Sequence, residues 1–449
     1  MYDFIVAGGG IAGVFFAWRM NTFFPNKKIL LVEKEERLGG RLLSYNLGNG
    51  MYVEQGGLRS FPDIDKELTK VLQMIGKKSF PVPYNEPQNV AELKGKRFLV
   101  SVGNATGAKK QELELLYNTG TTKSVNGSVS DAEVKLAPEI LGDWTKMFSS
   151  KKLNDEIYGE SLIKKGVSCG TIEAYRDLSG YNFAFDTPIG TSTGIRENSS
   201  LSGTSQQHFI EGGYDSVVFE IAKRLTNTKV VLGATLVSFD QNLECKILGL
   251  GKVKTENLIL ALPPNALCLL GIDYFPYVEN WSAFKAFFTV SEETWRLLSL
   301  DGQRKGRNVS SGVARQIWFY SERPYVLMLY CDNASGLFWR NLIPKEKNGS
   351  FEPCGKYPEL TENFRERCSK MFGVPKPEID LETVLFYYHN HGAFFWKAGG
   401  YRDLTRINDR VSVIGSAISI SPGWVNGAIQ SSEIVLRRYG IPSVLKNAK

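Results

Sequence analysis

The chain has 449 residues, and its 54 lysines and arginines against 47 aspartates and glutamates give a formal net charge of +7. The length predicts roughly two to four domains, and the apolar fraction of 43% excludes a globally disordered chain. Because the basic residues are dispersed and no stretch approaches the roughly 18 apolar residues of a membrane helix, we expect neither nucleic acid nor a membrane as a partner.

The first elements along the chain are predicted to be a strand, a helix and a second strand. Residues 2–7 are short, apolar and followed by glycines, which is typical of a buried parallel strand. Residues 11–24 favour a helix that ends before Pro25, and residues 28–33 form a second apolar run. Residues 104–135 are rich in Gly, Ser, Thr and Asn, which indicates a surface excursion.

A second αβ pattern begins after Gly212 and Gly213, where apolar residues at helical spacing predict a helix over residues 214–225. The other predicted elements are strands over residues 229–232, 235–239, 257–262, 284–290, 325–330 and 411–415, and helices over residues 360–371 and 425–439.

A glycine fingerprint joins the first strand to the first helix. Gly8, Gly10 and Gly13 fit the G-x-G-x-x-G pattern, and Glu33 ends the next strand 20 residues beyond Gly13. In this context the glycines allow a tight turn, close approach to a pyrophosphate and close packing of helix on strand, while Glu33 accepts hydrogen bonds from a ribose. The helix N-terminus offers free N–H groups to the phosphates. We therefore predict a dinucleotide site.

The predicted fold class is α/β, with a Rossmann-like domain built from discontinuous segments and an inserted domain of mixed sheet plus helices. The predicted boundaries place residues 1–65, 205–275 and 405–449 in the dinucleotide domain, and residues 66–204 and 276–404 in the inserted domain, which includes a helical insertion.

Three further motifs distinguish one dinucleotide from another. Residues 37–44 match R-x-G-G-R-x-x-[ST], residues 260–264 read L-A-L-P-P, and residues 423–429 read G-W-V-N-G-A-I. With the glycine fingerprint, these motifs resemble the signatures of the flavin-containing amine oxidase superfamily, in the order that the family has them. The resemblance extends from residue 4 to residue 436, nearly the whole chain.

The resemblance implies FAD as the cofactor. The residues that it implies for cofactor binding are Gly8, Gly10, Ile11, Ala12, Gly13, Glu33, Lys34, Gly39, Gly40, Arg41, Gly56, Gly57, Leu58, Arg59, Val237, Gly415, Ser416, Gly423, Trp424 and Val425. Family members that hold the flavin covalently use a cysteine near the C-terminal motif, and residues 386–424 contain none. We therefore expect non-covalent FAD.

Arg59 is the residue that most narrows the substrate class. The stretch Glu54 to Pro62 resembles the segment of L-amino-acid oxidases in which an arginine follows the glycine turn, whereas monoamine and polyamine oxidases generally lack it. A guanidinium can donate two parallel hydrogen bonds to a carboxylate. The resemblance implies that Arg59 and Tyr330 bind the α-carboxylate of the substrate.

Lys285 stands among large apolar residues of a predicted strand, where a lysine is rarely buried without a partner. In the resembled family this lysine holds a water molecule near the flavin. Trp424 and either Phe395 or Trp396 are expected to line the substrate cavity, together with Tyr181. The features around Tyr181, Lys285 and Tyr330 are most similar to the L-tryptophan oxidases of bisindole-pigment biosynthesis.

The resemblance implies a reaction with Lys285, Arg59, Tyr330 and Trp424 at its centre. The expected reaction is oxidative deamination of an L-amino acid with an aromatic or large apolar side chain, with O₂ reduced to H₂O₂. The alternatives are a monoamine or polyamine oxidase, a flavin desaturase or mutase, and a non-catalytic relative that keeps the fold as a scaffold. A homodimer and a downstream enzyme that consumes the imine are further expectations.

The cysteines and the N-terminus bear on metal binding and location. Six cysteines show no C-x-x-C spacing, and only three histidines accompany them, so we expect no metal site. Residues 1–18 are apolar, but Asp3 and three glycines argue against a signal peptide. The expected location is the cytoplasm, where thiols stay reduced.

Overall fold

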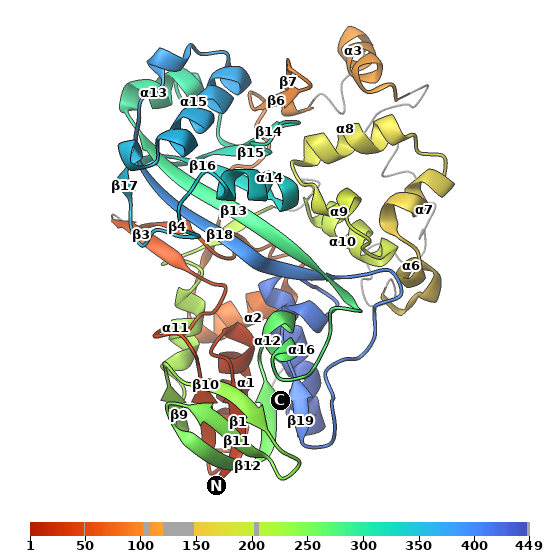
Figure 1. Cartoon of the computed structure of the whole chain (residues 1–449), viewed down its shortest axis with the longest axis vertical. Helices are drawn as coiled ribbons and strands as arrows, with labels where there is room; N and C mark the ends of the chain where they lie inside the picture. The colour runs from red at the N-terminus through yellow and green to blue at the C-terminus, as the bar shows by residue number, and fades with distance from the viewer. Residues whose placement is uncertain (49, 102–106, 120–147, 202–205, 447–449) are drawn as a thin grey trace. The chain divides into compact units, whose positions relative to one another are not determined.

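The computed structural model describes residues 1–48, 50–101, 107–119, 148–201 and 206–446. The chain divides into two compact units (Figure 1). The first comprises Met1–Pro81, His208–Glu279 and Ala393–Lys449, and the second comprises Val82–Gln207 and Asn280–Gly392. Within the described ranges, no helix has both the length and the apolar character needed to cross a membrane.

The first unit contains a seven-stranded sheet with a parallel centre. Its spatial order is β10 (Thr235–Phe239), β11 (Glu244–Leu248), β12 (Gly251–Leu260), β1 (Tyr2–Ala7), β2 (Ile29–Val32) and β9 (Thr228–Val231), and β19 (Val411–Val413) also pairs with β12. The centre is parallel because β1 is joined to β2 through a helix. Residues 4–7 of β1 and all of β2 are apolar and buried, because both faces of the sheet are covered there.

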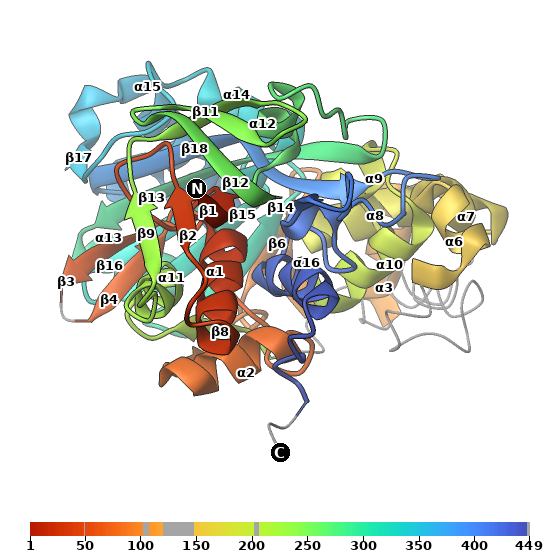
Figure 2. The same ribbon diagram turned by 90° about the horizontal axis from the view of Figure 1, so that it is seen from below.

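Helices cover this sheet and form a core with it. The helices are α1 (Ile11–Phe23), α2 (Lys66–Ile75), α11 (Ser216–Ala222), α12 (Pro264–Cys268) and α16 (Val425–Arg438). Figure 2 shows α1 between α11 and α16, and buried side chains of all three pack with α2 and β1 in one cluster. Two short antiparallel pairs complete the unit: β3 (Ser44–Gly48) with β4 (Met51–Glu54), and β5 (Ser79–Pro81) with β8 (His208–Ile210).

The second unit contains a largely antiparallel sheet of eight strands. Its order is β17 (Glu352–Pro353), β18 (Leu381–Trp396), β13 (Val278–Val290), β16 (Tyr325–Asp332), β15 (Gln316–Glu322), β14 (Gly306–Ser310), β6 (Val90–Leu93) and β7 (Lys96–Leu99). The helices α13 (Glu292–Ser299), α14 (Asn333–Arg340) and α15 (Pro358–Phe372) share a core with one face of it. The other helices in the described part of this unit are α3 (Gly107–Tyr117), α6 (Lys151–Asp155), α7 (Tyr158–Lys164), α8 (Cys169–Ser179), α9 (Phe183–Asp186) and α10 (Thr191–Leu201).

The boundaries of the two units differ from the predicted domain boundaries. Residues 66–81, 276–279 and 393–404 belong to the first unit rather than to the inserted domain, and the described residues 206 and 207 belong to the second. Residues 66–81 join the first unit because Leu68, Val71, Leu72 and Ile75 of α2 lie in its core. Residues 393–404 join it because the indole N–H of Trp396 donates to the Ser419 carbonyl at 2.7 Å.

Two predictions on local structure also change. The predicted helix over residues 214–225 is shortened to Ser216–Ala222, because its last residues continue as single turns such as Leu225 N–H to the Ala222 carbonyl. Of the predicted surface excursion over residues 104–135, Gly107–Tyr117 form a helix, and residues 104–106 and 120–135 lie outside the described ranges.

Candidate active site

The first turn of the glycine fingerprint is enforced by close packing against the end of β12. Gly8 has a φ of 111°, and a Cβ at Gly8 would collide with the carbonyl oxygen of Ala261. A Cβ at Gly13 would collide with the Gly8 carbonyl oxygen and would lie 3.0 Å from the Cβ of Ala261. Both glycines are therefore required by the protein's own packing, and Ala261 is the partner that sequence reasoning did not single out.

Gly10 differs, because open space surrounds the position where its Cβ would be. A Cβ there would meet no atom within 4 Å, and the backbone at Gly10 (φ −72°, ψ 176°) suits any residue. Gly10 is the N-cap residue of α1, and no side chain of Gly10 accepts a hydrogen bond from the N–H groups of the first turn. The missing side chain therefore leaves room beside a helix N-terminus, as an anionic group requires.

Glu33 lies at the end of β2 and braces the same turn. One carboxylate oxygen accepts the N–H of Gly9 at 2.7 Å and the other accepts the N–H of Glu35 at 2.9 Å. Each carboxylate oxygen can accept a second hydrogen bond, so these contacts leave acceptor capacity for hydroxyl groups. The predicted role of Glu33 toward a ribose stays a prediction.

Arg37 stabilises the loop of residues 37–42, which contains Gly39 and Gly40. Its guanidinium donates to the carbonyl oxygens of Leu38 and Leu42 at 3.0 Å and of Gly40 at 2.8 Å. The N–H of Gly39 in turn donates to the Gly9 carbonyl at 2.9 Å. Arg37 thereby holds the loop next to the fingerprint, a role that the motif did not reveal.

Arg41 extends from this loop to the C-terminal segment. Its guanidinium donates to the hydroxyl of Ser416 at 3.1 Å, and loss of surrounding water lowers the pKa of Arg41 to about 10. Next to Ser416, the N–H of Gly415 donates to the hydroxyl of Ser431 at 2.8 Å. A Cβ at Gly415 would meet only the Leu262 carbonyl oxygen, at 3.9 Å. A cation beside an open backbone stretch is suited to a pyrophosphate.

Arg59 is held between two fixed points of the backbone. Before it, the N–H of Gly57 donates to the Arg41 carbonyl at 3.0 Å; after it, Ser60 and His208 exchange backbone hydrogen bonds at 3.0 and 2.9 Å. Only 5% of Arg59 and 7% of Leu58 are exposed. A buried guanidinium on a loop that is fixed at both ends is a candidate for binding an anionic ligand.

Aromatic side chains of the first unit gather near this loop and the start of α16. The rings of Phe61 and Trp424 are 5.1 Å apart in an edge-on arrangement. Gly423 has a φ of 80°, and a Cβ there would lie 2.7 Å from the Phe395 ring. Phe395 therefore packs against the segment that carries Trp424, whereas the indole N–H of Trp396 is engaged by Ser419.

Lys285 and Tyr330 of the second unit are directly opposite each other on β13 and β16. Lys285 is 2% exposed, and its ammonium lies 5.0 Å from the centre of the Tyr330 ring. Tyr181 packs edge-on against the same ring at 5.8 Å. The structure thus brings together Lys285, Tyr330 and Tyr181, as a cation over an aromatic face.

Four of the predicted cofactor residues are exposed, namely Lys34, Gly40, Val237 and Gly423. The side chain of Lys34 is 69% exposed and forms an ion pair with Glu35 at 3.3 Å. Val237 is 39% exposed on β10, at a register irregularity. Ile11, Ala12 and Leu58 are buried, and Val425 is partly buried against the core that contains α1. These four side chains therefore contribute to packing.

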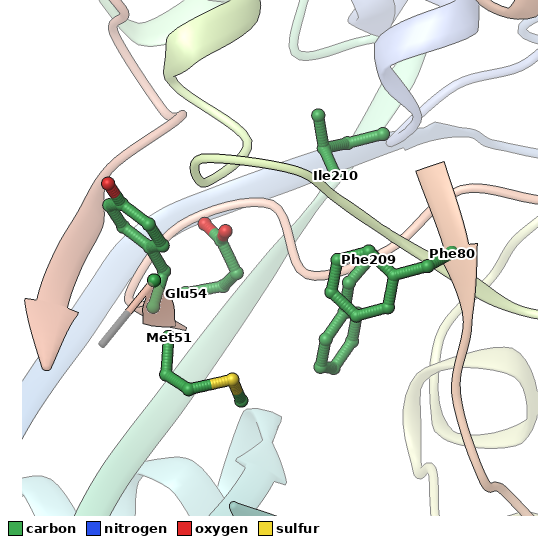
Figure 3. A pocket seen from close by; sticks show the side chains of 7 residues that line it. Met51, Glu54, Phe80, Phe209 and Ile210 are labelled. Atoms are coloured by element: carbon green, nitrogen blue, oxygen red, sulfur yellow. The ribbon is translucent and has the colours of Figure 1, made fainter. Parts of the chain in front are cut away.

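A small pocket of about 20 Å³ contains none of the predicted site residues (Figure 3). It is lined by Gly50, Met51, Tyr52, Glu54, Phe80, Phe209 and Ile210. Its volume suits one or two water molecules. The carboxylate of Glu54 is already used by the N–H of Tyr214 at 2.8 Å and the hydroxyl of Ser44 at 2.7 Å, so we assign this pocket no chemistry.

The family model described as "Flavin containing amine oxidoreductase" matches residues 11–435. The chain belongs to this family of flavin-containing amine oxidoreductases. A relative in Acanthamoeba polyphaga mimivirus, an uncharacterized protein, is 35% identical over 99% of this chain and 95% of its own length. An L-amino acid dehydrogenase of Synechocystis is 32% identical over 81 residues, which are 18% of this chain and 17% of that protein.

Solved structures of putrescine oxidase resemble the amine oxidoreductase described here. The wild-type enzyme bound to putrescine matches with a TM-score of 0.68 and 16% identity, over 98% of this chain and 99% of that one. A double variant of the same enzyme gives the same values. At this identity the likeness shows the fold, and it confirms the predicted α/β class with mixed sheets and helices.

The residues of the first unit fit a flavin dinucleotide. The open space at Gly10 and Gly415, the N-terminus of α1 and the Arg41 guanidinium offer room and positive charge to phosphates. Glu33 has acceptor capacity for a ribose. These residues would hold the dinucleotide in this flavoenzyme.

Proposed function

We propose that this protein oxidatively deaminates an L-amino acid with an aromatic or large apolar side chain. The observation that carries the proposal is Arg59, a guanidinium that is 5% exposed and fixed on both sides by backbone hydrogen bonds. A cation in this position favours a substrate that carries a carboxylate.

The same cation argues against a diamine as the substrate. Putrescine is the ligand named for the structural neighbour, and it carries amines at both ends. A buried guanidinium repels ammonium groups, and the low dielectric of a buried site strengthens the repulsion. The short match to an L-amino acid dehydrogenase also supports an amino-acid substrate.

Aromatic side chains supply the preference for a large apolar side chain. Phe61, Trp424 and Phe395 gather beside the Arg59 loop in the first unit. Aromatic rings bind apolar groups through buried area and ring–ring contacts. Whether Tyr330 of the second unit also binds the carboxylate stays a prediction.

In the proposed reaction the substrate loses two electrons and one proton from Cα and a proton from nitrogen. The bound flavin would accept the two electrons and pass them to O₂ or another acceptor. Water then hydrolyses the imino acid to a 2-oxo acid and ammonium. Arg59 orients the substrate, and such placement can contribute roughly 7–11 kcal/mol to lowering a barrier.

The proposal is tested by anaerobic mixing of the flavin-loaded protein with each of the twenty L-amino acids, putrescine and spermidine. Bleaching of the flavin absorbance reports reduction without any choice of acceptor. We expect rapid bleaching by L-tryptophan, L-phenylalanine or a similar amino acid, and none by putrescine. Rapid bleaching by putrescine or spermidine and by no amino acid would contradict the proposal.

Readmission of O₂ to the reduced protein then separates two electron acceptors. Reoxidation within seconds, with one H₂O₂ per substrate, is expected of an oxidase. Slow reoxidation by O₂ and fast reoxidation by a dye would identify a dehydrogenase on the same amino acid.

A further inference from the structure

Asp332 is a fully buried carboxylate that the proposed reaction does not use. It is the last residue of β16, two positions beyond Tyr330, so both side chains lie on the same face of the strand. Burial raises the pKa of Asp332 above its ordinary value, and Arg315 and nearby N–H groups oppose the shift. A carboxylate kept in such a place needs several donors.

Three donors from two separate segments meet at Asp332. The backbone N–H groups of Asn182 and Phe183 donate to one of its oxygens at 2.9 and 3.0 Å. The indole N–H of Trp281, on β13, donates to the same oxygen at 3.2 Å. Through these hydrogen bonds, Asp332 holds the start of α9 and the indole of Trp281 against the end of β16.

The segments that Asp332 holds carry four aromatic rings, those of Tyr181, Phe183, Trp281 and Tyr330. Each of these rings contacts two of the others, and we call this cluster the ring circuit. Tyr330 contacts Tyr181 at 5.8 Å and Trp281 at 6.4 Å between ring centres. Phe183 closes the circuit, at 6.4 Å from Tyr181 and 6.0 Å from Trp281. All four contacts are edge-on, a preferred geometry of aromatic pairs. Their arrangement depends on where Asp332 places the two segments.

We propose that Asp332 is a positioning residue that fixes the rings of Tyr181, Trp281 and Tyr330 for substrate binding. The inference rests on the proposed function, because Tyr181, Lys285 and Tyr330 are predicted residues of the substrate site. It assigns Trp281 to substrate selection as well, a residue for which no motif predicts a role.

The test compares Asp332→Asn and Trp281→Phe singly and together. Asp332→Asn keeps the shape but removes the charge that holds three donors, and Trp281→Phe keeps a ring but removes one donor. We expect each single variant to raise KM about tenfold while kcat changes less than threefold, because substrate binding is lost and not the chemistry. The double variant is expected to exceed Asp332→Asn by less than threefold, because both act through one contact.

Trp339→Phe is the matched control. Trp339 is buried on the opposite face of the same sheet, and its indole N–H donates to the Val313 carbonyl at 2.7 Å. This variant loses a comparable hydrogen bond, so its stability should fall as in Trp281→Phe while KM stays within twofold of wild type. A purely structural role of Asp332 would make KM respond alike in Trp339→Phe and Trp281→Phe, which would overturn the proposal.

A second readout does not depend on activity. The eight tryptophans give eight indole N–H signals in a nitrogen-15 NMR spectrum, and Trp281→Phe identifies one of them. Asp332→Asn should shift that signal and leave the Trp339 signal in place. An unshifted Trp281 signal, or unchanged KM in folded Asp332→Asn, would refute the positioning role. If Asp332→Asn does not fold, the KM of Trp281→Phe against Trp339→Phe decides.

Failure of the proposed function is distinguishable from failure of this inference. If only an amine reduces the wild-type flavin, the amino-acid assignment fails, and the same variants are compared on that amine. The KM changes and the indole shift then decide the role of Asp332 as before.

Discussion

Two glycines of one fingerprint are required for different physical reasons. Gly13 is in contact with Gly8 and Ala261, so its missing Cβ serves the packing of α1 on the sheet. Gly10 faces open space, so its missing Cβ leaves room that a ligand would use. The motif treats its three glycines as equivalent, whereas the structure shows that Gly10 and Gly13 have different surroundings.

Substitution of the two glycines should separate folding from cofactor binding. Gly10→Val places its side chain in open space, so we expect the free energy of unfolding without flavin to change by only about 0.5 kcal/mol. Its flavin content should fall at least about tenfold, because the side chain fills the phosphate site. Gly13→Val should unfold the protein or lower its free energy of unfolding by roughly 1–3 kcal/mol or more. Flavin absorbance per protein and urea unfolding measure both, and full flavin content in Gly10→Val would show that the site lies elsewhere.

Lys285 is a buried cation whose predicted role near the flavin can be tested by substitution. We expect Lys285→Met, which keeps length and removes charge, to slow flavin reduction or reoxidation at least about tenfold, roughly 1.4 kcal/mol in barrier. Rapid mixing measures the two steps apart. The control is Lys397→Met, since Lys397 is a partly exposed lysine paired with Glu279 at 3.4 Å. Wild-type rates for both steps in Lys285→Met would rule out a part for the ammonium.

At the scale of elements, α16 and α2 are joined by a polar contact at the start of α16. The side-chain amide of Asn426 donates to Glu67 at 2.8 Å and its oxygen accepts the N–H of Leu68 at 2.8 Å. Gln430 also donates to Glu67, at 3.2 Å. The helix that begins at the C-terminal motif is thereby positioned by α2.

Asn426→Asp should loosen this joint by setting two carboxylates against each other. We expect a loss of roughly 1–3 kcal/mol in the free energy of unfolding at pH 7, because a buried donor becomes an acceptor. Glu67→Gln added to Asn426→Asp should recover most of the loss, since the glutamine amide can donate to the new carboxylate. Urea unfolding of the single and double variants measures the recovery, and equal losses in both would contradict the contact.

Elements with a strong local signal were predicted well, and those that depend on distant contacts were not. The β1 strand matches its predicted residues, and α1 ends one residue earlier than predicted, because apolar runs between glycine and proline punctuation need no tertiary information. By contrast, the predicted boundaries place residues 66–75 in the inserted domain, whereas α2 packs in the core of the first unit, because the sequence does not show which core its apolar face joins. The β11 strand was missed although Cys245 and Ile247 alternate with polar residues.

The same division holds for the candidate site. The glycine turns, Arg41 and the buried Arg59 followed from motifs. Asp332 and Trp281 lie in no recognisable motif. Their hydrogen bonds join segments that are 51 and 150 residues apart in sequence, which no local pattern reveals.

At the scale of the whole molecule, both units are built from separated segments: the first unit includes both ends of the chain, and the second is interrupted by residues 208–279. Cofactor attachment is testable at this scale. All six cysteines are free, and Cys354 and Cys368 are buried beside α15 in the second unit's core. Burial raises the pKa of the Cys354 thiol to about 11, so it is a poor nucleophile at neutral pH.

Because residues 386–424 contain no cysteine, non-covalent flavin is the expected state. Acid precipitation of the purified protein should release more than about nine-tenths of the flavin absorbance to the supernatant, since no covalent bond retains it. A yellow pellet with flavin-bearing peptides after digestion would contradict this prediction.

The central claim is that Arg59 binds a substrate carboxylate, and one comparison of matched substrates tests it most directly. L-tryptophan and tryptamine, or L-phenylalanine and phenethylamine, differ only in the carboxylate. Wild type should prefer the acid by about 100-fold or more in kcat/KM for flavin reduction, roughly the 2.7 kcal/mol of a charge-assisted contact. Arg59→Met should lose that preference and keep its flavin. Equal rates of wild type with acid and amine, or an unchanged preference in Arg59→Met, would contradict the account.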